Sequence, residues 1–284
     1  MIDNCKIFIG PMSKNVVDAV CEVANKSQNP IGLIPSRRQV EFTGGYVNNW
    51  DTYSFSNYVT EKSKNVIIQR DHGGPGQGNE EDDGKDSLEI DTLSSFQLIH
   101  IDPWKVSKSL RSAADTTVDL INFCDSIKSD QKYEIGTEEA IRRYTHRELK
   151  RFLDIVFSKL GKKSKKIKFG VIQSGTSLMG TKNTGSFNQD RLYRMIKVCN
   201  DFDILSKEHN GDYLSLDEIR VRFDTGLSAI NIAPEMGRDE TKIILDEIRN
   251  LGREDLYDKF FKICYKSKKW VKWFDKDFSP KSSK

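Results

Sequence analysis

Histidine is scarce in this chain, and three of its four copies stand at or near the ends of short apolar runs. His72 closes residues 66–72, His100 lies within 98–102, and His209 follows 203–208. Each run predicts a buried strand, and in parallel α/β folds the carboxyl ends of the strands share the face where active sites form. Imidazoles that meet there beside carboxylates would bind a divalent metal, and the carboxylates on offer are Asp71, Asp102, Glu138 and Asp212.

The composition of the 284 residues indicates a globular protein without a strongly charged partner. Hydrophobic residues make up 37% of the chain and aromatic residues 10%, which supports a packed core and argues against disorder. The net charge of +3 gives no reason to expect nucleic acid or an anionic membrane as a partner. The five scattered cysteines form no CxxC pair, and no apolar stretch reaches membrane-spanning length, so we expect reduced thiols in a soluble, cytoplasmic protein.

Strand-like and helix-like segments alternate along the chain, which predicts an α/β protein with a (β/α)8 TIM barrel. A doubly wound sheet is the rival, but its G-x-G-x-x-G fingerprint is missing after the first strand. We expect the barrel to occupy residues 1–252, followed by a C-terminal helical extension with a frayed tail at 253–284. The expected strands are 6–9, 30–34, 65–69, 98–101, 132–136, 167–173, 202–206 and 229–233, and the helices include 15–26, 146–160 and, as the eighth, 240–251.

Polar residues follow the predicted strands more densely than stability requires. Arg37 could hold a sugar phosphate or carboxylate through two hydrogen bonds, or make a surface ion pair. His100 and Asp102 alternate along one strand and so point to one side, either within the site or as a buried polar pair. His146 opens a helix among arginines and is expected at the surface. The residues expected to bind substrate are Arg37, Gln39, Gly45, His100, Asp102, Ser174, Asp212 and Asn231.

The strand-end motifs resemble those of the GatZ/KbaZ family, the non-catalytic subunits of class II D-tagatose-1,6-bisphosphate aldolase. A single motif such as Asp71-His72-x-Gly74-Pro75 is weak, whereas seven in the same order are specific. The resemblance covers about residues 6–237 and implies a TIM barrel related to the zinc-dependent class II aldolases. The motifs are Gln39-Val40, Gly44-Gly45-Tyr46, Asp71-His72-x-Gly74-Pro75, Ile99-His100-Ile101-Asp102, Glu134-Ile135-Gly136-Thr137-Glu138, Gln173-x-Gly175 and His209-x-x-Asp212-Tyr213.

Similarity to those aldolases implies a role for each matching residue. Asp71 would be an acid/base, His72 and His209 metal ligands, and Glu138 or Glu139 a ligand or proton-transfer group. Gln173 stands where the aldolases carry a further zinc histidine, and their Gly-Gly-Ser-Gly phosphate loop is missing here. We therefore expect Asp71 and Glu138 as catalytic residues, and His72, His209 and Gln173 around a divalent metal, with zinc as the expected ion.

Such a site could run aldol chemistry on a sugar or sugar phosphate. The metal would polarise a ketose carbonyl, Glu138 would take a proton to give an enediolate, and Asp71 would exchange a proton with the hydroxyl at the cleaved bond. The same intermediate also serves a sugar epimerase. Two further alternatives are a non-catalytic partner of a class II aldolase subunit, which the aromatic tail around Trp270 and Trp273 favours, and a sugar-binding barrel without chemistry. Association of the chain with itself is a further expectation.

Overall fold

The fold is a closed barrel of eight parallel strands, seen in a computed structural model that describes residues 1–137 and 142–268. The strands follow one another around the barrel in the order β1, β10, β9, β6, β5, β4, β3, β2. The prediction of a (β/α)8 barrel is therefore confirmed. The strands are β1 (Ile7–Ile9), β2 (Ile31–Leu33), β3 (Val66–Gly73), β4 (Leu98–Ile101), β5 (Lys132–Gly136), β6 (Ile167–Ile172), β9 (Leu205–Glu208) and β10 (Ala229–Ile232).

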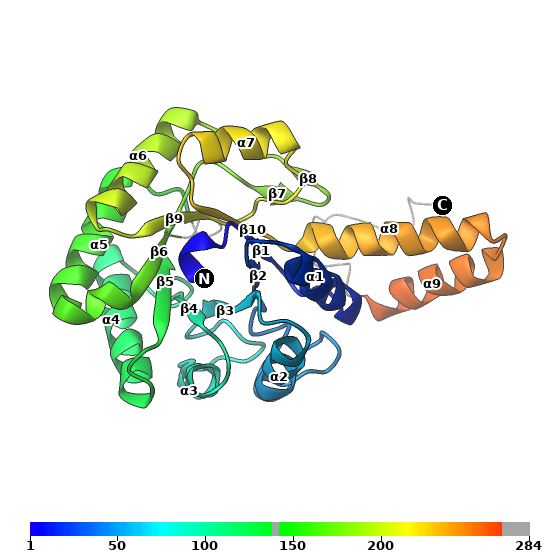
Figure 1. Cartoon of the computed structure of the whole chain (residues 1–284), viewed down its shortest axis with the longest axis horizontal. Coiled ribbons are helices and arrows are strands. Elements are labelled where there is room, and N and C mark those ends of the chain that lie inside the picture. Colours follow the sequence, from blue (N-terminus) through cyan, green and yellow to red (C-terminus); the bar gives the residue numbers. More distant parts are fainter. Residues whose placement is uncertain (138–141, 269–284) are drawn as a thin grey trace. The chain divides into compact units, whose positions relative to one another are not determined.

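Helices surround the strands, and α1 to α7 can be followed around the barrel in Figure 1. A small antiparallel hairpin of β7 (Leu178–Met179) and β8 (Lys182–Asn183) stands between β6 and α6. Short 3-10 helices occupy Ile2–Asn4 and Gly161–Lys166. The helices are α1 (Lys14–Lys26), α2 (Thr52–Lys62), α3 (Lys85–Leu93), α4 (Leu110–Ile127), α5 (His146–Leu160), α6 (Gln189–Asp201), α7 (Leu216–Asp224), α8 (Pro234–Asn250) and α9 (Glu254–Ser267).

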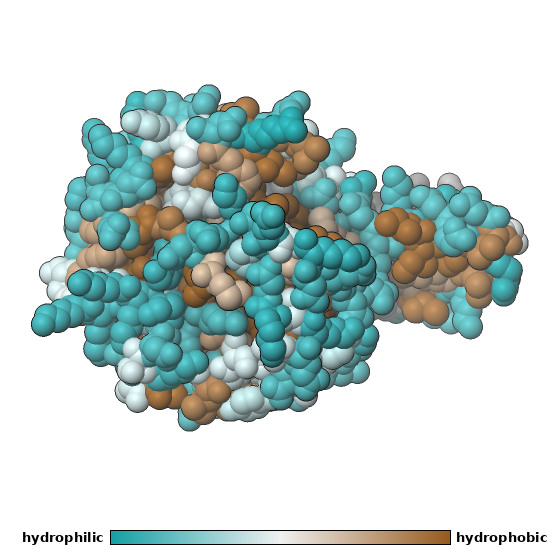
Figure 2. Space-filling model, viewed as in Figure 1, coloured by the Kyte–Doolittle hydropathy of each residue, from teal (hydrophilic) through white to brown (hydrophobic). Residues whose placement is uncertain are grey.

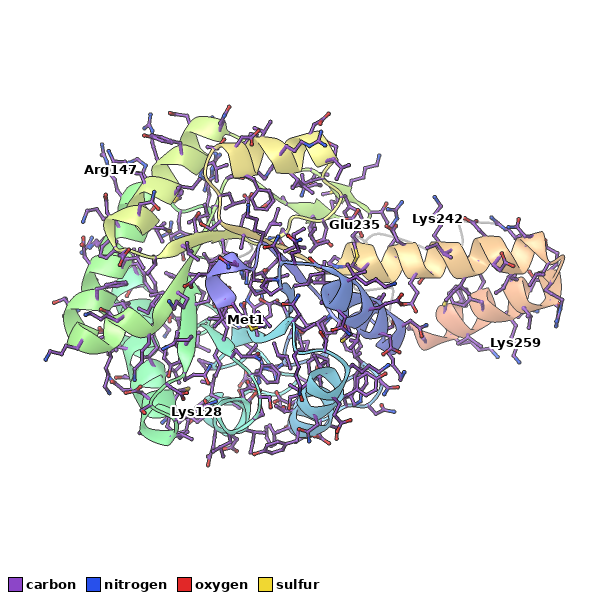
Figure 3. All side chains as sticks on the ribbon, in the orientation of Figure 1. Met1, Lys128, Arg147, Glu235, Lys242 and Lys259 are labelled. Atoms are coloured by element: carbon purple, nitrogen blue, oxygen red, sulfur yellow. The ribbon has the colours of Figure 1, made fainter. Side chains whose placement is uncertain are left out.

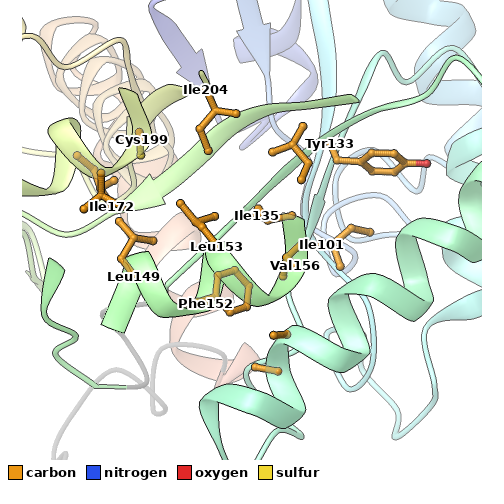
Figure 4. Close-up of a cluster of buried hydrophobic side chains, with 14 of the residues drawn as sticks. Ile101, Tyr133, Ile135, Leu149, Phe152, Leu153, Val156, Ile172, Cys199 and Ile204 are labelled. Atoms are coloured by element: carbon orange, nitrogen blue, oxygen red, sulfur yellow. The ribbon is translucent and has the colours of Figure 1, made fainter. Parts of the chain in front are cut away.

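Helix α5 shows how the sequence specifies these elements. The Thr145 side chain accepts a hydrogen bond from the backbone N–H of Glu148, whose carboxylate accepts one from the backbone N–H of Thr145, which fixes the start of the helix. Leu149, Phe152 and Val156 recur at helical spacing and are fully buried. They pack with outward-facing strand residues in the cluster of Figure 4, so the main core lies between the strands and the helices.

The barrel interior carries an apolar layer with a polar layer above it. Side chains alternate along each strand between the interior and the helix-facing side. Phe8 and Phe169 belong to the apolar interior cluster. One step further toward the carboxyl ends, the alternation brings in Gln69, Glu134 and Lys207, which are all fully buried. Burying charged groups is costly unless they are paired. A polar layer at this depth therefore indicates that the residues serve a functional site at the carboxyl ends of the strands.

The chain divides into two compact units, Met1–Gly237 and Arg238–Lys284. The sequence predicts this boundary after residue 252, with the eighth helix in the barrel unit. Only the first turn of α8 belongs to the barrel unit, and α8 buries no side chain, whereas α5 buries five. Three apolar residues of 240–251 are exposed instead, namely Ile243, Ile244 and Leu251. Figure 2 shows a hydrophobic surface over α8 and α9.

Two further expectations concern the aromatic C-terminal tail and membrane-spanning segments. Trp270 and Trp273, which we expected in a partner contact, lie outside the described residues. Within the described ranges, no helix combines the length and the apolar character that crossing a membrane requires.

Candidate metal centre

Three histidines from separate parts of the chain meet at the carboxyl ends of the barrel strands. His72 stands near the end of β3, His100 in β4 and His209 directly after β9. Their ring centroids lie 5.1 Å (His72 to His100), 5.4 Å (His72 to His209) and 5.1 Å (His100 to His209) apart. Together with Asp71 they offer four ligand atoms within 4.8 Å of one another. A cluster of imidazole nitrogens and one carboxylate suits a divalent transition metal such as zinc.

A β-bulge brings Asp71 and His72 to the same mouth. Neighbouring residues of a regular strand point to opposite sides. The pairing of β3 with β4 shifts register between Arg70 and Gly73, and His72 adopts a φ of 49°. Its Nε2 then lies 3.6 Å from Oδ2 of Asp71. Bulges and strained backbone of this kind are common beside functional sites, where they redirect a side chain.

Asp102 fixes the ring of His72. Its Oδ2 lies 2.7 Å from Nδ1 of His72 and accepts a hydrogen bond from Nε2 of Gln77 at 2.8 Å. Its Oδ1 accepts one from the backbone N–H of Trp104 at 3.0 Å. Burial would raise the pKa of Asp102, but His72 lowers it, and the pKa lies below its ordinary value. A carboxylate on one ring nitrogen leaves the other nitrogen of His72 to face a metal.

Glu134 and Lys207 support His209 from below. Oε1 of Glu134 lies 3.0 Å from Nε2 of His209, and its Oε2 lies 2.9 Å from Nζ of Lys207. Lys207 donates to Oε1 of Gln69 at 2.6 Å, and its Nζ lies 3.4 Å from the ring centroid of Phe8. Burial would raise the pKa of Glu134, but Lys207 and His209 hold it well below its ordinary value. Glu134 is therefore an ionised partner for an imidazole.

Asp71 is the carboxylate of the cluster itself. Its Oδ1 lies 3.9 Å from Nδ1 of His100 and makes no hydrogen bond with a described residue. Burial would raise its pKa, but His72 and the other two imidazoles lower it well below the ordinary value of an aspartate. Asp71 thus stands as a carboxylate with acceptor capacity left over, which a proton-transfer group needs.

Gln173 was predicted as a ligand, but its amide is engaged elsewhere. Its Oε1 accepts from the backbone N–H of Tyr144 at 2.8 Å and from Nη2 of Arg191 at 2.7 Å. Its Nε2 donates to the carbonyl of Arg142 at 3.3 Å. These bonds tie the end of β6 to the segment before α5. We therefore replace Gln173 by His100 in the proposed ligand set.

Arg37, Gln39 and Gly45 have structural partners on the rim after β2. Arg37 is buried and pairs with Glu41 at 2.6 Å and with Asp82 at 2.5 Å, so its charge is balanced within the chain. Gln39 accepts from the backbone N–H of Ser36 at 2.9 Å. A Cβ on Gly45 would lie 2.0 Å from the carbonyl oxygen of Gln39, so only glycine fits there. Their predicted contact with substrate stays a prediction.

Ser174, Asp212 and Asn231 differ in how their side chains are engaged. The backbone N–H and the hydroxyl of Ser174 both bond to Glu208. Asp212 accepts from the backbone N–H groups of Ala233 and of Glu235, which Figure 3 labels near the start of α8. Asn231 is 4% exposed, and neither atom of its amide has a hydrogen-bond partner among the described residues. A buried amide without partners suits a ligand contact.

One predicted site residue lies outside the described ranges, and some residues of the site were not singled out from the sequence. Glu138, predicted as catalytic, lies outside the described residues. Lys207 and Gln77 were not predicted, and Glu134 stood in a strand-end motif without a role of its own. The one available signal was charge inside apolar strands, since Glu134 stands between Tyr133 and Ile135 in a buried run.

Fold and site together define a (β/α)8 barrel with a histidine and carboxylate cluster at the carboxyl ends of its strands. The chain matches no protein-family profile, and no curated protein is similar to it in sequence. Solved structures do share its fold. A probable tagatose 6 phosphate kinase from Sinorhizobium meliloti 1021 superposes with a TM-score of 0.82 at 14% identity, over 98% of this chain and 78% of that one.

Two aldolases have similar folds at lower TM-scores. The YdjI aldolase from Escherichia coli K12 gives a TM-score of 0.64 at 12% identity, over 87% of this chain and 82% of its own. The fructose-bisphosphate aldolase from Campylobacter jejuni gives 0.63 at 18% identity, over 88% and 75%. These likenesses establish the TIM-barrel fold. The narrower resemblance to the GatZ/KbaZ family stays a prediction.

Proposed function

We propose that the protein is a metal-dependent aldolase that acts on a sugar or a sugar phosphate. The observation that carries this proposal is the meeting of His72, His100 and His209 with Asp71 at the barrel mouth. In barrel enzymes this face holds the chemistry. The aldolases among the structural neighbours support the choice of reaction.

The three imidazoles are the residues we expect to hold the metal. Asp102 behind His72 and Glu134 behind His209 are the carboxylate partners that orient metal-binding histidines. A divalent metal bound here would act as a Lewis acid toward the carbonyl oxygen of a ketose.

The remaining chemistry falls to the chain's own side chains. Asp71 would take the proton of the substrate hydroxyl next to the bond that breaks, and return it in the synthetic direction. The unpartnered amide of Asn231 can both donate to and accept from substrate hydroxyl groups. Glu138 is kept as the proposed base at the carbon beside the carbonyl, as the resemblance implies.

Metal content of the purified protein tests the proposal. His72→Ala, His100→Ala and His209→Ala should each lower bound metal well below one equivalent, because each removes an imidazole from the cluster. His146→Ala is the matched control: it removes the fourth histidine, which stands at the start of α5, and should keep the metal. Equal metal content in all four variants would refute the site. Metal-free protein that co-purifies with an aldolase subunit would instead support a non-catalytic partner.

Substrate class needs a separate measurement. Purified protein should be incubated with ketoses, ketose phosphates, and aldehydes together with dihydroxyacetone phosphate, and the products identified. Cleavage or condensation products that disappear with His209→Ala support an aldolase. Inverted sugars of unchanged length would refute it in favour of an epimerase.

A further inference from the structure

The loop between β3 and α3 carries one buried side chain back to the metal centre. Residues 74–84 contain no helix or strand, and residues 79–83 are exposed. Gln77 differs from them, because only 5% of it is exposed. Its Nε2 donates to Oδ2 of Asp102 at 2.8 Å and to the backbone carbonyl of Asp102 at 3.2 Å. Both amide hydrogens of Gln77 are therefore used on the residue that holds His72.

These contacts fix how Asp102 meets His72. Oδ2 of Asp102 accepts from Gln77 and lies 2.7 Å from Nδ1 of His72. An ionised carboxylate can only accept hydrogen bonds, so Nδ1 of His72 carries the hydrogen and Nε2 the lone pair that a metal needs. The other oxygen, Oδ1, accepts from the backbone N–H of Trp104. Gln77 and this N–H together keep the carboxylate from turning away from the imidazole.

Gln77 needs support from outside its own segment, because glycine stands on either side of it. Gly76 has a φ of 67°, and glycine loses more conformational freedom on ordering than any other residue. The carbonyl of Gly76 accepts from Nζ of Lys105, and that of Gly78 accepts from Nε of Arg38, each at 3.2 Å. Lys105 follows β4 and Arg38 follows β2, so the segments after both neighbours of β3 hold the peptide groups around Gln77.

A buried arginine closes the loop at its base. Nη1 and Nη2 of Arg37 donate to the two carboxylate oxygens of Asp82 at 2.9 and 2.5 Å, and Nη1 also donates to the carbonyl of Gly74 at 2.9 Å. The backbone N–H of Gly76 donates to the carbonyl of Asp82 at 3.2 Å, which brings the two ends of the loop together. Paired hydrogen bonds from a planar guanidinium hold a carboxylate in one orientation. This pair, the Arg37–Asp82 clamp, thus sets the position of the loop.

We propose that Gln77 is a positioning residue of the metal centre, held by the Arg37–Asp82 clamp and acting on His72 through Asp102. Among the described residues, Gln77 makes no hydrogen bond to the four members of the cluster, so its effect passes through Asp102. Groups that orient a metal-binding histidine typically change metal affinity by about 10–100-fold. The inference rests on the proposed function, because it concerns the metal which that function requires.

Zinc affinity of the full-length protein, measured by competition with a chelator of known affinity, tests the role of Gln77. Gln77→Met keeps the length of the side chain but removes both donors, and it should weaken zinc binding about tenfold. Gln131→Met is the matched control: it removes an equally buried glutamine that precedes β5 at the opposite end of the strands, and it should keep the affinity. Equal zinc affinity in Gln77→Met and the unaltered protein, or an equal loss in Gln131→Met, would overturn the proposal.

A second pair of variants tests the clamp. Asp82→Ala removes the carboxylate that Arg37 holds, and it should weaken zinc binding by no more than Gln77→Met does. Asp83→Ala makes the same change of charge at the adjacent, exposed position and should bind zinc like the unaltered protein. Because the clamp acts through Gln77, the double variant Gln77→Met/Asp82→Ala should match Gln77→Met alone. Additive losses, or unaltered affinity in Asp82→Ala, would overturn the part assigned to the clamp.

Activity assays separate this inference from the proposed function. With an active substrate, excess zinc should restore most of the turnover of Gln77→Met, because the substitution loosens the metal and leaves the proton-transfer groups in place. Low turnover at saturating zinc would overturn the positioning role. A tenfold loss of zinc affinity in a protein without aldol activity would refute the proposed function and leave the role of Gln77 standing. Aldol activity with equal zinc affinity in both proteins would do the reverse.

Discussion

Replacing Lys207 by methionine tests the buried network that supports the cluster. The side chains of Lys207 and Glu134 are both 0% exposed, and Nζ lies 2.9 Å from Oε2. With an effective dielectric constant of about 20, Coulomb's law gives an attraction of about 6 kcal/mol at this distance. Methionine keeps the contact with Phe8 but leaves the Glu134 carboxylate buried without its cation. We expect the free energy of unfolding to fall by about 3–5 kcal/mol at neutral pH.

The double variant Lys207→Met/Glu134→Gln gives the sharper readout. It carries no uncompensated buried charge, so it should recover most of the stability that Lys207→Met loses. Urea unfolding of metal-free protein, followed by circular dichroism, measures all four members of the cycle. A loss below about 1 kcal/mol for Lys207→Met, or simple additivity of the two changes, would refute the reasoning.

The pKa shifts of the pair give the physical reason for this expectation. Burial lowers the pKa of Lys207, and the attraction to Glu134 opposes that shift without cancelling it. Lys207 is thus held in an unfavourable environment, while Glu134 is stabilised as a carboxylate. The pair contributes little net stability, and its consequence is an ionised Glu134 next to His209.

Three further predictions follow from the same contacts. Asp71→Asn should keep fold and metal content but lower turnover by about two to four orders of magnitude; near-normal turnover in steady-state assays would remove Asp71 from the mechanism. Glu134→Gln should weaken metal binding about 10–100-fold through the lost support of His209, and competition with a chelator of known affinity measures it. Burial raises the pKa of Asp212 to about 6 from an unfolded value of 3.8, so the folded state holds this proton more tightly. The free energy of unfolding should therefore decrease as pH rises from 4 to 6, by up to about 3 kcal/mol, and Asp212→Asn should flatten that decrease in unfolding experiments across this range; parallel profiles for both proteins would contradict it.

The sequence determined the fold class and the positions of several chemical groups. The spacing of apolar residues and the length of the segment alone predicted α5 at residues 146–160, where the structure has it. This was possible because an apolar face at helical spacing is a local property of the sequence. The histidines at strand ends were equally visible, since the carboxyl ends of barrel strands lie on one face. His72, His100 and His209 therefore belong together on sequence grounds, although only two of them were predicted as ligands.

Tertiary structure alone decided which polar groups pair. The seventh barrel strand was predicted at residues 202–206 and lies at 205–208, which turns Lys207 from a residue beyond the strand into an interior partner of Glu134. Gln173 was expected at the metal, but the segment before α5 and Arg191 of α6 engage its amide. Such pairs join residues distant in sequence, and their choice depends on strand register and on a bulge at His72. No local pattern encodes either, because both arise when eight strands close into one ring.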